Sequence, residues 1–119
     1  MFMERKNRII LEKLLSEAKL IEEYIDGCSE SVFLGDSKTQ RAVCMTLVNI
    51  GELVKKLTDE VKADNQDIPW RRISDFRNIV AHEYEAVKME RVWETVTAHM
   101  PILQKQIENI LDKNLMRKR

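Results

Sequence analysis

Four side chains that can handle protons and phosphate groups fall within eight positions of the sequence. They are Arg77, Asn78, His82 and Tyr84. His82 can act as an acid or a base because histidine titrates near neutral pH. Arg77 stays charged and can hold phosphate oxygens through two N–H groups. The spacing alone is weak evidence, since a single histidine beside an apolar face is more often structural than catalytic.

The segment around these side chains has the pattern of a helix. Pro69 suits its first turn, where a missing N–H costs nothing. Asn78 and His82 are four residues apart and share one face. Arg77 lies well round the helix from His82, so either its side chain reaches around or the helix loosens before His82. The apolar positions recur at helical spacing and are Trp70, Ile73, Phe76, Val80 and Tyr84.

Length and charge limit what the rest of the chain can be. Its 119 residues are enough for one domain, 1–119, with a single core. The 20 basic and 20 acidic residues cancel, so no overall field attracts nucleic acid. An RNA site must therefore be local or be made by joining two chains. Only 3 Gly and 2 Pro are present, a composition typical of helical proteins.

The cysteines and histidines do not form a metal-binding pattern. Cys28 and Cys44 stand alone, and free thiols in a reducing cytosol are the simplest interpretation. Neither His82 nor His99 has ligand spacing with a cysteine, so we expect no metal and no cofactor. No apolar run is long enough to span a bilayer. We expect a cytoplasmic protein with no membrane partner.

Three further helices are predicted. They cover residues 7–25, 38–62 and 89 to about 111, and the last is expected to bend at Pro101. Short connections then give an all-α, up-down bundle of four main helices. The apolar positions of the second helix alternate spacings of four and three, as along the seam where two coiled-coil helices meet. Together with the Met-rich last helix, they offer more apolar surface than a small bundle needs. We therefore expect a homodimer.

The middle of the second helix holds a second candidate group. Gly51 costs about 1 kcal/mol there relative to alanine, so its presence indicates close approach by a neighbour. Asn49 and Glu52 lie on one face beside it. They are candidates to support a site, although a plain solvated face is an equally good interpretation.

Several motifs together resemble a known family. The stretch Ile-Pro-Trp-Arg, followed by Arg-Asn-x-x-Ala-His-x-Tyr, is similar to the signature of HEPN-domain proteins, specifically the HepT-like toxin family. The resemblance covers nearly the whole chain. The matching segments are 33–36, 41–43, 50–52, 68–71, 77–84, 92–93 and 100–103.

The resemblance implies a function and roles for particular residues. It implies the dimeric toxin of a toxin–antitoxin pair, whose antitoxin is a minimal nucleotidyltransferase. The toxin would be a metal-independent endoribonuclease with Arg77 and His82 as the catalytic pair and Asn78 as the accompanying polar residue. The antitoxin would adenylylate Tyr84. A two-fold dimer would also gather both copies of Arg71, Arg72 and Arg77 into one RNA-binding groove.

Two other functions fit the same residues. Arg77 and His82 could bind a phosphate without cleaving anything, in a helical module that presents a nucleotide or substrate to a nucleotidyltransferase. A plain structural bundle is the other alternative. In that case Arg71 and Arg72 are only solvated, and Tyr84 is an anchor with its hydroxyl at the surface.

Overall fold

The computed structural model describes residues 3–117, and this part of the chain is helical without strands. The all-α prediction is confirmed. None of the helices in that range is both long and apolar enough to cross a membrane. In chain order the elements are α1 (Arg5–Tyr24), α2 (Glu30–Leu34), α3 (Ser37–Lys56), α4 (Asp59–Asp64), α5 (Trp70–His82), the 3₁₀ turn η1 (Tyr84–Ala86), α6 (Met89–Glu94), the π-helical turn η2 (Thr95–His99) and α7 (Met100–Arg117).

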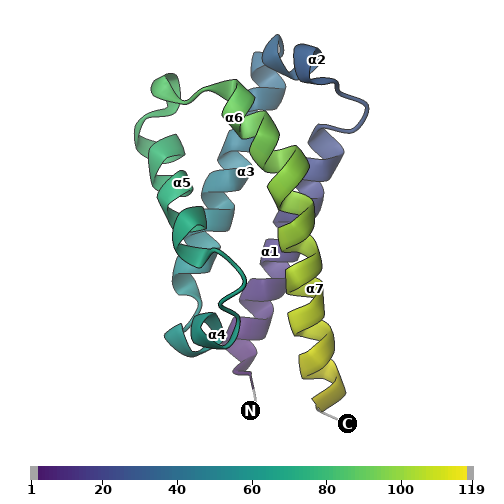
Figure 1. Cartoon of the computed structure of the whole chain (residues 1–119), viewed down its shortest axis with the longest axis vertical. Coiled ribbons are helices and arrows are strands. Elements are labelled where there is room, and N and C mark those ends of the chain that lie inside the picture. The colour runs from purple at the N-terminus through teal and green to yellow at the C-terminus, as the bar shows by residue number, and fades with distance from the viewer. Residues whose placement is uncertain (1–2, 118–119) are drawn as a thin grey trace.

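The long helices lie along one axis of a body measuring 48 × 29 × 20 Å. Helix α3 packs against both α1 and α5, and α1 also packs against α7. In Figure 1, α6, η2 and α7 follow one another as a single rod on the right, and α5 stands on the left with α3 behind. Both termini lie at the lower end, and α2 lies at the other end. The finer description, an up-down bundle of four helices, stays a prediction.

The apolar seam of the second predicted helix is buried inside this chain. Its residues are between 0% and 7% exposed, so they form the core. The repeating positions of the last helix are buried as well, namely Val92, Val96, Met100, Leu103 and Ile107, whereas Ile102 beside them is 57% exposed. These repeating apolar positions are therefore used within the chain and do not supply the surplus surface from which we expected a dimer, which stays a prediction. The seam residues are Val43, Leu47, Ile50, Val54, Leu57 and Val61.

The second predicted helix is broken, because α3 ends at Lys56 and α4 begins at Asp59. Leu57 is extended, with φ −70° and ψ 145°. Thr58 caps α4 by accepting a hydrogen bond from the Val61 N–H. Asn7 of α1 accepts from the Thr58 N–H at 3.2 Å and donates to the Thr58 hydroxyl at 3.0 Å. A buried partner 51 residues away thus stabilises the break, which helical periodicity cannot predict.

The π-helical turn η2 directly precedes α7, whose second residue is Pro101. Proline has no N–H to donate to the preceding turn. A π turn changes the hydrogen-bonding register locally and is a common form of helix irregularity. The helix that we expected to be continuous is irregular next to the predicted position, while the bend at Pro101 stays a prediction.

Candidate functional site

Helix α5 ends at His82, the histidine that the sequence analysis selected as a candidate. The Glu83 N–H still donates to the Ile79 carbonyl at 2.8 Å, but Glu83 itself has left the helical conformation, with φ −134° and ψ 38°. The turn η1 then begins at Tyr84. The expectation that the helix ends or loosens near His82 is confirmed. Tyr84 is therefore free of the angular relation to His82 that a regular helix would impose.

One side of α5 is fixed to the core, which determines what the other side presents. Trp70 and Val80 are buried, while Ile73 and Phe76 are partly buried against the core. The Trp70 indole N–H donates to the Asn65 carbonyl at 3.1 Å and anchors the start of the helix. The opposite side is an exposed stripe spaced by four, three and four residues. We call it the α5 stripe: Arg71, Asp75, Asn78 and His82.

The side chain of Arg77 extends from α5 directly beside Gly51 of α3, the glycine that the sequence analysis selected. A Cβ atom on Gly51 would fall far inside van der Waals contact with Cβ and Cγ of Arg77. These atoms are next to the α5 backbone and cannot swing aside as the end of a long side chain could. Gly51 therefore permits the close approach of α3 and α5 at Arg77. The close approach predicted from this mid-helix glycine is confirmed.

The Arg77 guanidinium is held by two acceptors. Its Nη2 forms an ion pair with Glu52 of α3, and its Nη1 donates to Asn78 Oδ1 at 3.0 Å. Lys55 donates to the same Asn78 oxygen at 3.3 Å. Buried Arg77 Nε has no partner among the described residues. We call these four residues the Arg77 network, and they place two cations beside one amide at the α3–α5 junction.

Asn78 connects the Arg77 network to the α5 stripe. Within residues 3–117 no hydrogen bond joins Arg77 to His82. Arg77 instead reaches round to Asn78, which is one helical turn before His82 on the same face. His82 itself is exposed. The geometry agrees with the expectation that a regular helix does not bring Arg77 and His82 into contact.

Asn49 is directed away from this network. Its amide donates to Glu17 of α1 at 3.0 Å, so it connects α3 to α1 and not to α5. Asn49 and Glu52 line one shallow hollow, as their spacing predicted. Only Glu52 of the two reaches Arg77. The structure thus gives Asn49 no contact with the candidate catalytic residues.

Tyr84 packs against the core next to an arginine that the sequence left without a role. The Arg41 guanidinium carbon lies 5.3 Å from the centre of the Tyr84 ring, a cation–π distance. Lys55 was missed in the same way. Both lie on α3, and Lys55 is three residues after Glu52, so helical spacing was the available signal. Their partners, however, are on segments far along the chain.

The two arginines at the start of α5 lie on different sides of that helix. Arg71 belongs to the α5 stripe. Arg72 lines a groove of about 620 Å³ between α5 and the rod formed by α6, η2 and α7. Arg77, Arg91 and His99 line the same groove. The structure therefore separates Arg71 from Arg72, which the sequence had treated as one RNA-binding pair.

The cysteines differ in their surroundings. Cys28 is half-buried, and Cys44 is 2% exposed in the core. Burial raises the pKa of the Cys44 thiol to about 11. Within the described part of the chain, no three His, Cys, Asp or Glu side chains are grouped as a metal site requires.

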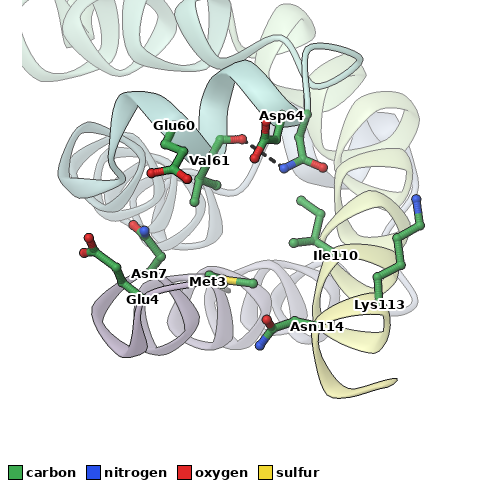
Figure 2. Close-up of a pocket in the computed structure, with 10 residues that line it drawn as sticks. Met3, Glu4, Asn7, Glu60, Val61, Asp64, Ile110, Lys113 and Asn114 are labelled. Atoms are coloured by element: carbon green, nitrogen blue, oxygen red, sulfur yellow. Dashed lines mark hydrogen bonds between the residues drawn. The ribbon is translucent and has the colours of Figure 1, made fainter. Parts of the chain in front are cut away.

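A second hollow lies at the end of the molecule where α1, α4 and α7 meet, and has a volume of about 410 Å³. Figure 2 shows Glu4, Glu60 and Asp64 around it, with Lys113 at its edge. Its hydrogen bonds are structural: the Asn65 amide, for example, donates to the Val61 carbonyl at 2.9 Å. The hollow contains neither histidine nor arginine, so we assign it no function.

Comparison with known proteins points to one family. The family model described as "Ribonuclease HepT-like" matches residues 14–110. A "Putative RNase TTE0752" of Caldanaerobacter subterraneus subsp. tengcongensis is 36% identical over 106 residues, covering 89% of this chain and 95% of the relative. A "Probable ribonuclease HepT" of Thermococcus cleftensis is 33% identical over 108 residues, covering 91% and 98%. No solved structure matches the chain significantly.

Proposed function

The chain belongs to the HepT-like ribonuclease family, and from this premise we propose that it is the RNA-cleaving toxin of a toxin–antitoxin pair. Its partner would be a minimal nucleotidyltransferase antitoxin. The active form would be a cytoplasmic homodimer of a single domain, residues 1–119. The observation that carries this proposal is the position of the Arg77 network one turn before an exposed His82.

RNA supplies its own nucleophile, so the proposed reaction needs few protein groups. The 2′-oxygen attacks the adjacent phosphorus, and the bond from phosphorus to the 5′-oxygen breaks. His82 of one protomer takes the proton from the 2′-hydroxyl, and the second His82 of the dimer gives a proton to the leaving 5′-oxygen. The products are a 2′,3′-cyclic phosphate and a 5′-hydroxyl. No metal or cofactor takes part in this sequence of steps.

Arg77 would stabilise the charge that develops on the phosphate. Its guanidinium can present two N–H groups to phosphate oxygens. In the structure those groups are occupied by Glu52 of α3 and by Asn78, which hold the guanidinium in one orientation. Glu52 and Asn78 thus act as positioning residues, and an RNA phosphate would replace one of these acceptors. Asn49 has no part in this arrangement.

The α5 stripe offers the surface on which the RNA backbone would lie. Arg71 is exposed and follows the same helical face as Asn78 and His82. Arg71 would bind a neighbouring phosphate of the same strand. Arg72 lines the groove beside the stripe, next to Asp75, and its proposed RNA contact would come from there.

Tyr84 would be the point of control. It starts the turn η1 directly after α5, and its ring lies under Arg41. Adenylylation would add a negative phosphodiester and a base near the end of α5. That phosphate could pair with a nearby arginine and exclude the RNA phosphate from the site. Mass spectrometry after co-expression with the cognate antitoxin should find AMP on Tyr84, and AMP on Tyr24 instead would contradict this role.

The second candidate is a non-catalytic module that binds a nucleotide or substrate for a nucleotidyltransferase. It is supported by the Glu52–Arg77 ion pair, because a guanidinium that binds a carboxylate can bind a phosphate in the same way without any cleavage. Such a module would bind phosphate-bearing ligands without producing new RNA ends. The analysis of RNA ends therefore separates it from a nuclease.

The test is RNA digestion by purified protein in the presence of EDTA. We expect 2′,3′-cyclic phosphate ends and a loss of about 10²- to 10⁴-fold in rate for His82→Ala. His99→Ala is the matched control, because His99 is the other histidine of the chain. Equal activity in the wild type and the His82 variant would show a contaminating nuclease and refute the assignment.

A further inference from the structure

Lys55 supplies the one charge of the Arg77 network that has no opposite charge paired with it. The Arg77 guanidinium forms an ion pair with Glu52. In the part of the chain that the structure describes, no carboxylate forms an ion pair with Lys55. Lys55 is exposed and lies three residues after Glu52, on the same side of α3. The network thus has two cations and one carboxylate, and its surplus positive charge lies on an exposed lysine.

The Lys55 ammonium and the Arg77 guanidinium converge on one oxygen atom. Lys55 Nζ donates to Asn78 Oδ1 at 3.3 Å, and Arg77 Nη1 donates to the same oxygen at 3.0 Å. A phosphate oxygen carries negative charge that an amide oxygen lacks, so both cations attract it more strongly. The position of the Asn78 oxygen therefore marks a point at which a phosphate oxygen would contact two cations.

The charges around Lys55 do not provide this surplus. On the α5 stripe, Arg71 and Asp75 are four residues apart and have opposite charges. The whole chain has 20 basic and 20 acidic residues, so no overall field attracts RNA. Binding of a polyanion depends on cations that neutralise its phosphates. Lys55 can neutralise a phosphate without first losing a carboxylate partner, which Arg77 cannot do.

Resting on the proposed function, we propose that Lys55 is a catalytic residue that binds the phosphate to be cleaved together with Arg77. One non-bridging oxygen of this phosphate takes the place of the Asn78 oxygen between the two cations. As the 2′-oxygen bonds to phosphorus, negative charge grows on the non-bridging oxygens, and the Lys55 ammonium stabilises that charge. Lys55 keeps its proton throughout, and the proton transfers stay with His82.

The alternative is a structural role, in which Lys55 only joins α3 to α5 through its hydrogen bond to Asn78. Three substitutions separate the two roles. Lys55→Gln keeps an N–H donor but removes the charge, Lys55→Arg keeps the charge, and Lys55→Ala removes both donor and charge. Lys55→Gln preserves a structural role, whereas only Lys55→Arg preserves the binding of a phosphate.

The first measurement is the cleavage rate of end-labelled RNA in the presence of EDTA. We expect kcat/KM to fall by about 10- to 10²-fold for Lys55→Ala and Lys55→Gln, the range for losing one hydrogen bond between charged groups. Lys55→Arg should recover part of the rate, and circular dichroism checks the fold of each variant. A wild-type rate for Lys55→Gln would overturn the inference.

Lys56→Ala is the matched control for the loss of a lysine at this end of α3. Lys56 is the next residue of the helix and is also exposed. Within the described residues, Asn78 accepts its hydrogen bonds from Lys55 and Arg77, and none from Lys56. We expect kcat/KM of Lys56→Ala to stay close to that of the wild type. Equal losses for Lys56→Ala and Lys55→Ala would show a general effect of surface charge and overturn the specific role of Lys55.

The salt dependence of RNA binding detects the phosphate contact independently of cleavage. The probe is a single strand with 2′-O-methyl groups throughout, which removes the nucleophile. For each phosphate that a protein neutralises, the logarithm of its binding constant falls by about 0.7 per logarithm of the salt concentration. Lys55→Gln should reduce this slope by about 0.7 for each Lys55 that contacts a phosphate. An unchanged slope would overturn the inference.

A neutral linkage at the cleavage position tests which phosphate Lys55 contacts. In a methylphosphonate, a methyl group replaces one non-bridging oxygen and removes the negative charge. Lys55→Ala should weaken binding of the charged 2′-O-methyl strand by about tenfold or more and leave binding of the neutral strand nearly unchanged, because groups that contact each other are not additive. Equal losses with both strands would place the contact at another phosphate and overturn the catalytic role.

The two proposals can fail separately. Wild-type cleavage by Lys55→Gln, together with no cleavage by His82→Ala, would remove the role of Lys55 and leave the proposed nuclease in place. A wild-type protein that produces no new RNA ends would remove the nuclease and, with it, the catalytic role of Lys55. The salt dependence measured with the 2′-O-methyl strand would still decide whether Lys55 binds a phosphate.

Discussion

The two sides of α5 differ in how closely they are packed. Toward α3, the backbones approach so closely that only a glycine fits at position 51 beside Arg77. Toward the α6–α7 rod, the same helix leaves a groove of about 620 Å³ with exposed Ile79. Close packing holds a charged side chain in one orientation. The open side leaves apolar surface exposed. The comparison shows that the faces of one helix can be packed independently.

The largest effect is expected from adding a methyl group at position 51, where α3 and α5 pack most closely. Gly51→Ala would normally stabilise a helix, but here the added Cβ meets Cβ and Cγ of Arg77. We expect the free energy of unfolding to fall by about 1–3 kcal/mol from overpacking. RNA cleavage should fall as well, because Arg77 must move. Thermal unfolding and a cleavage assay measure the two effects.

Gly35→Ala is the control for this substitution. A Cβ on Gly35 would lie 3.7 Å from the Ser31 carbonyl oxygen and 3.8 Å from that of Val32, which are ordinary contacts. Gly35 also has a negative φ of −99°. We therefore expect Gly35→Ala to leave stability and cleavage nearly unchanged. A Gly51 variant as stable and active as this control would contradict the close packing.

A smaller effect is expected from the ion pair on the packed side. Glu52→Gln removes the charge that neutralises Arg77, but the pair is partly exposed, so the free energy of unfolding should change by less than about 1 kcal/mol. The guanidinium would meet RNA phosphates with less competition and would be less firmly oriented. We expect KM and kcat both to fall. Unchanged values of both would show that Glu52 does not position Arg77.

The smallest effect is expected for the thiol of Cys44, which lies on α3 in the protein core. Its pKa of about 11 leaves little thiolate at pH 8, so iodoacetamide should modify Cys28 and leave Cys44 intact in the folded protein. The unfolded chain loses this proton near its usual value of 9.0, earlier than the folded chain. Stability should therefore decrease as the pH rises from 9 toward 11. Equal labelling of both cysteines would contradict the burial of Cys44.

The sequence predicted local features of this molecule better than contacts between distant segments. Apolar spacing identified the buried face of α5, and the mid-helix Gly51 indicated a close neighbour. Periodicity could not show that Arg77 is that neighbour, because the contact joins two helices. It also could not predict the break at Thr58, which depends on Asn7 of α1.

In the candidate site too, local features were predicted and contacts between distant segments were not. Residue type and spacing selected Arg77, Asn78 and His82, and the structure connects the first two directly. Lys55 and Arg41 were missed because their partners lie on other elements. The periodic apolar pattern of the second helix could not decide for or against the predicted dimer, since such a pattern is the same whether it is buried within one chain or between two.

The central claim is that Arg77 and His82 act together on an RNA phosphate. The most direct measurement is the cleavage rate of end-labelled RNA, with EDTA present, for Arg77→Lys, His82→Ala and the double variant. We expect each single variant to lose about 10²- to 10⁴-fold, and the double variant to be little slower than the slower single one, because groups that act as a unit are not additive. Full activity in either single variant would contradict the account.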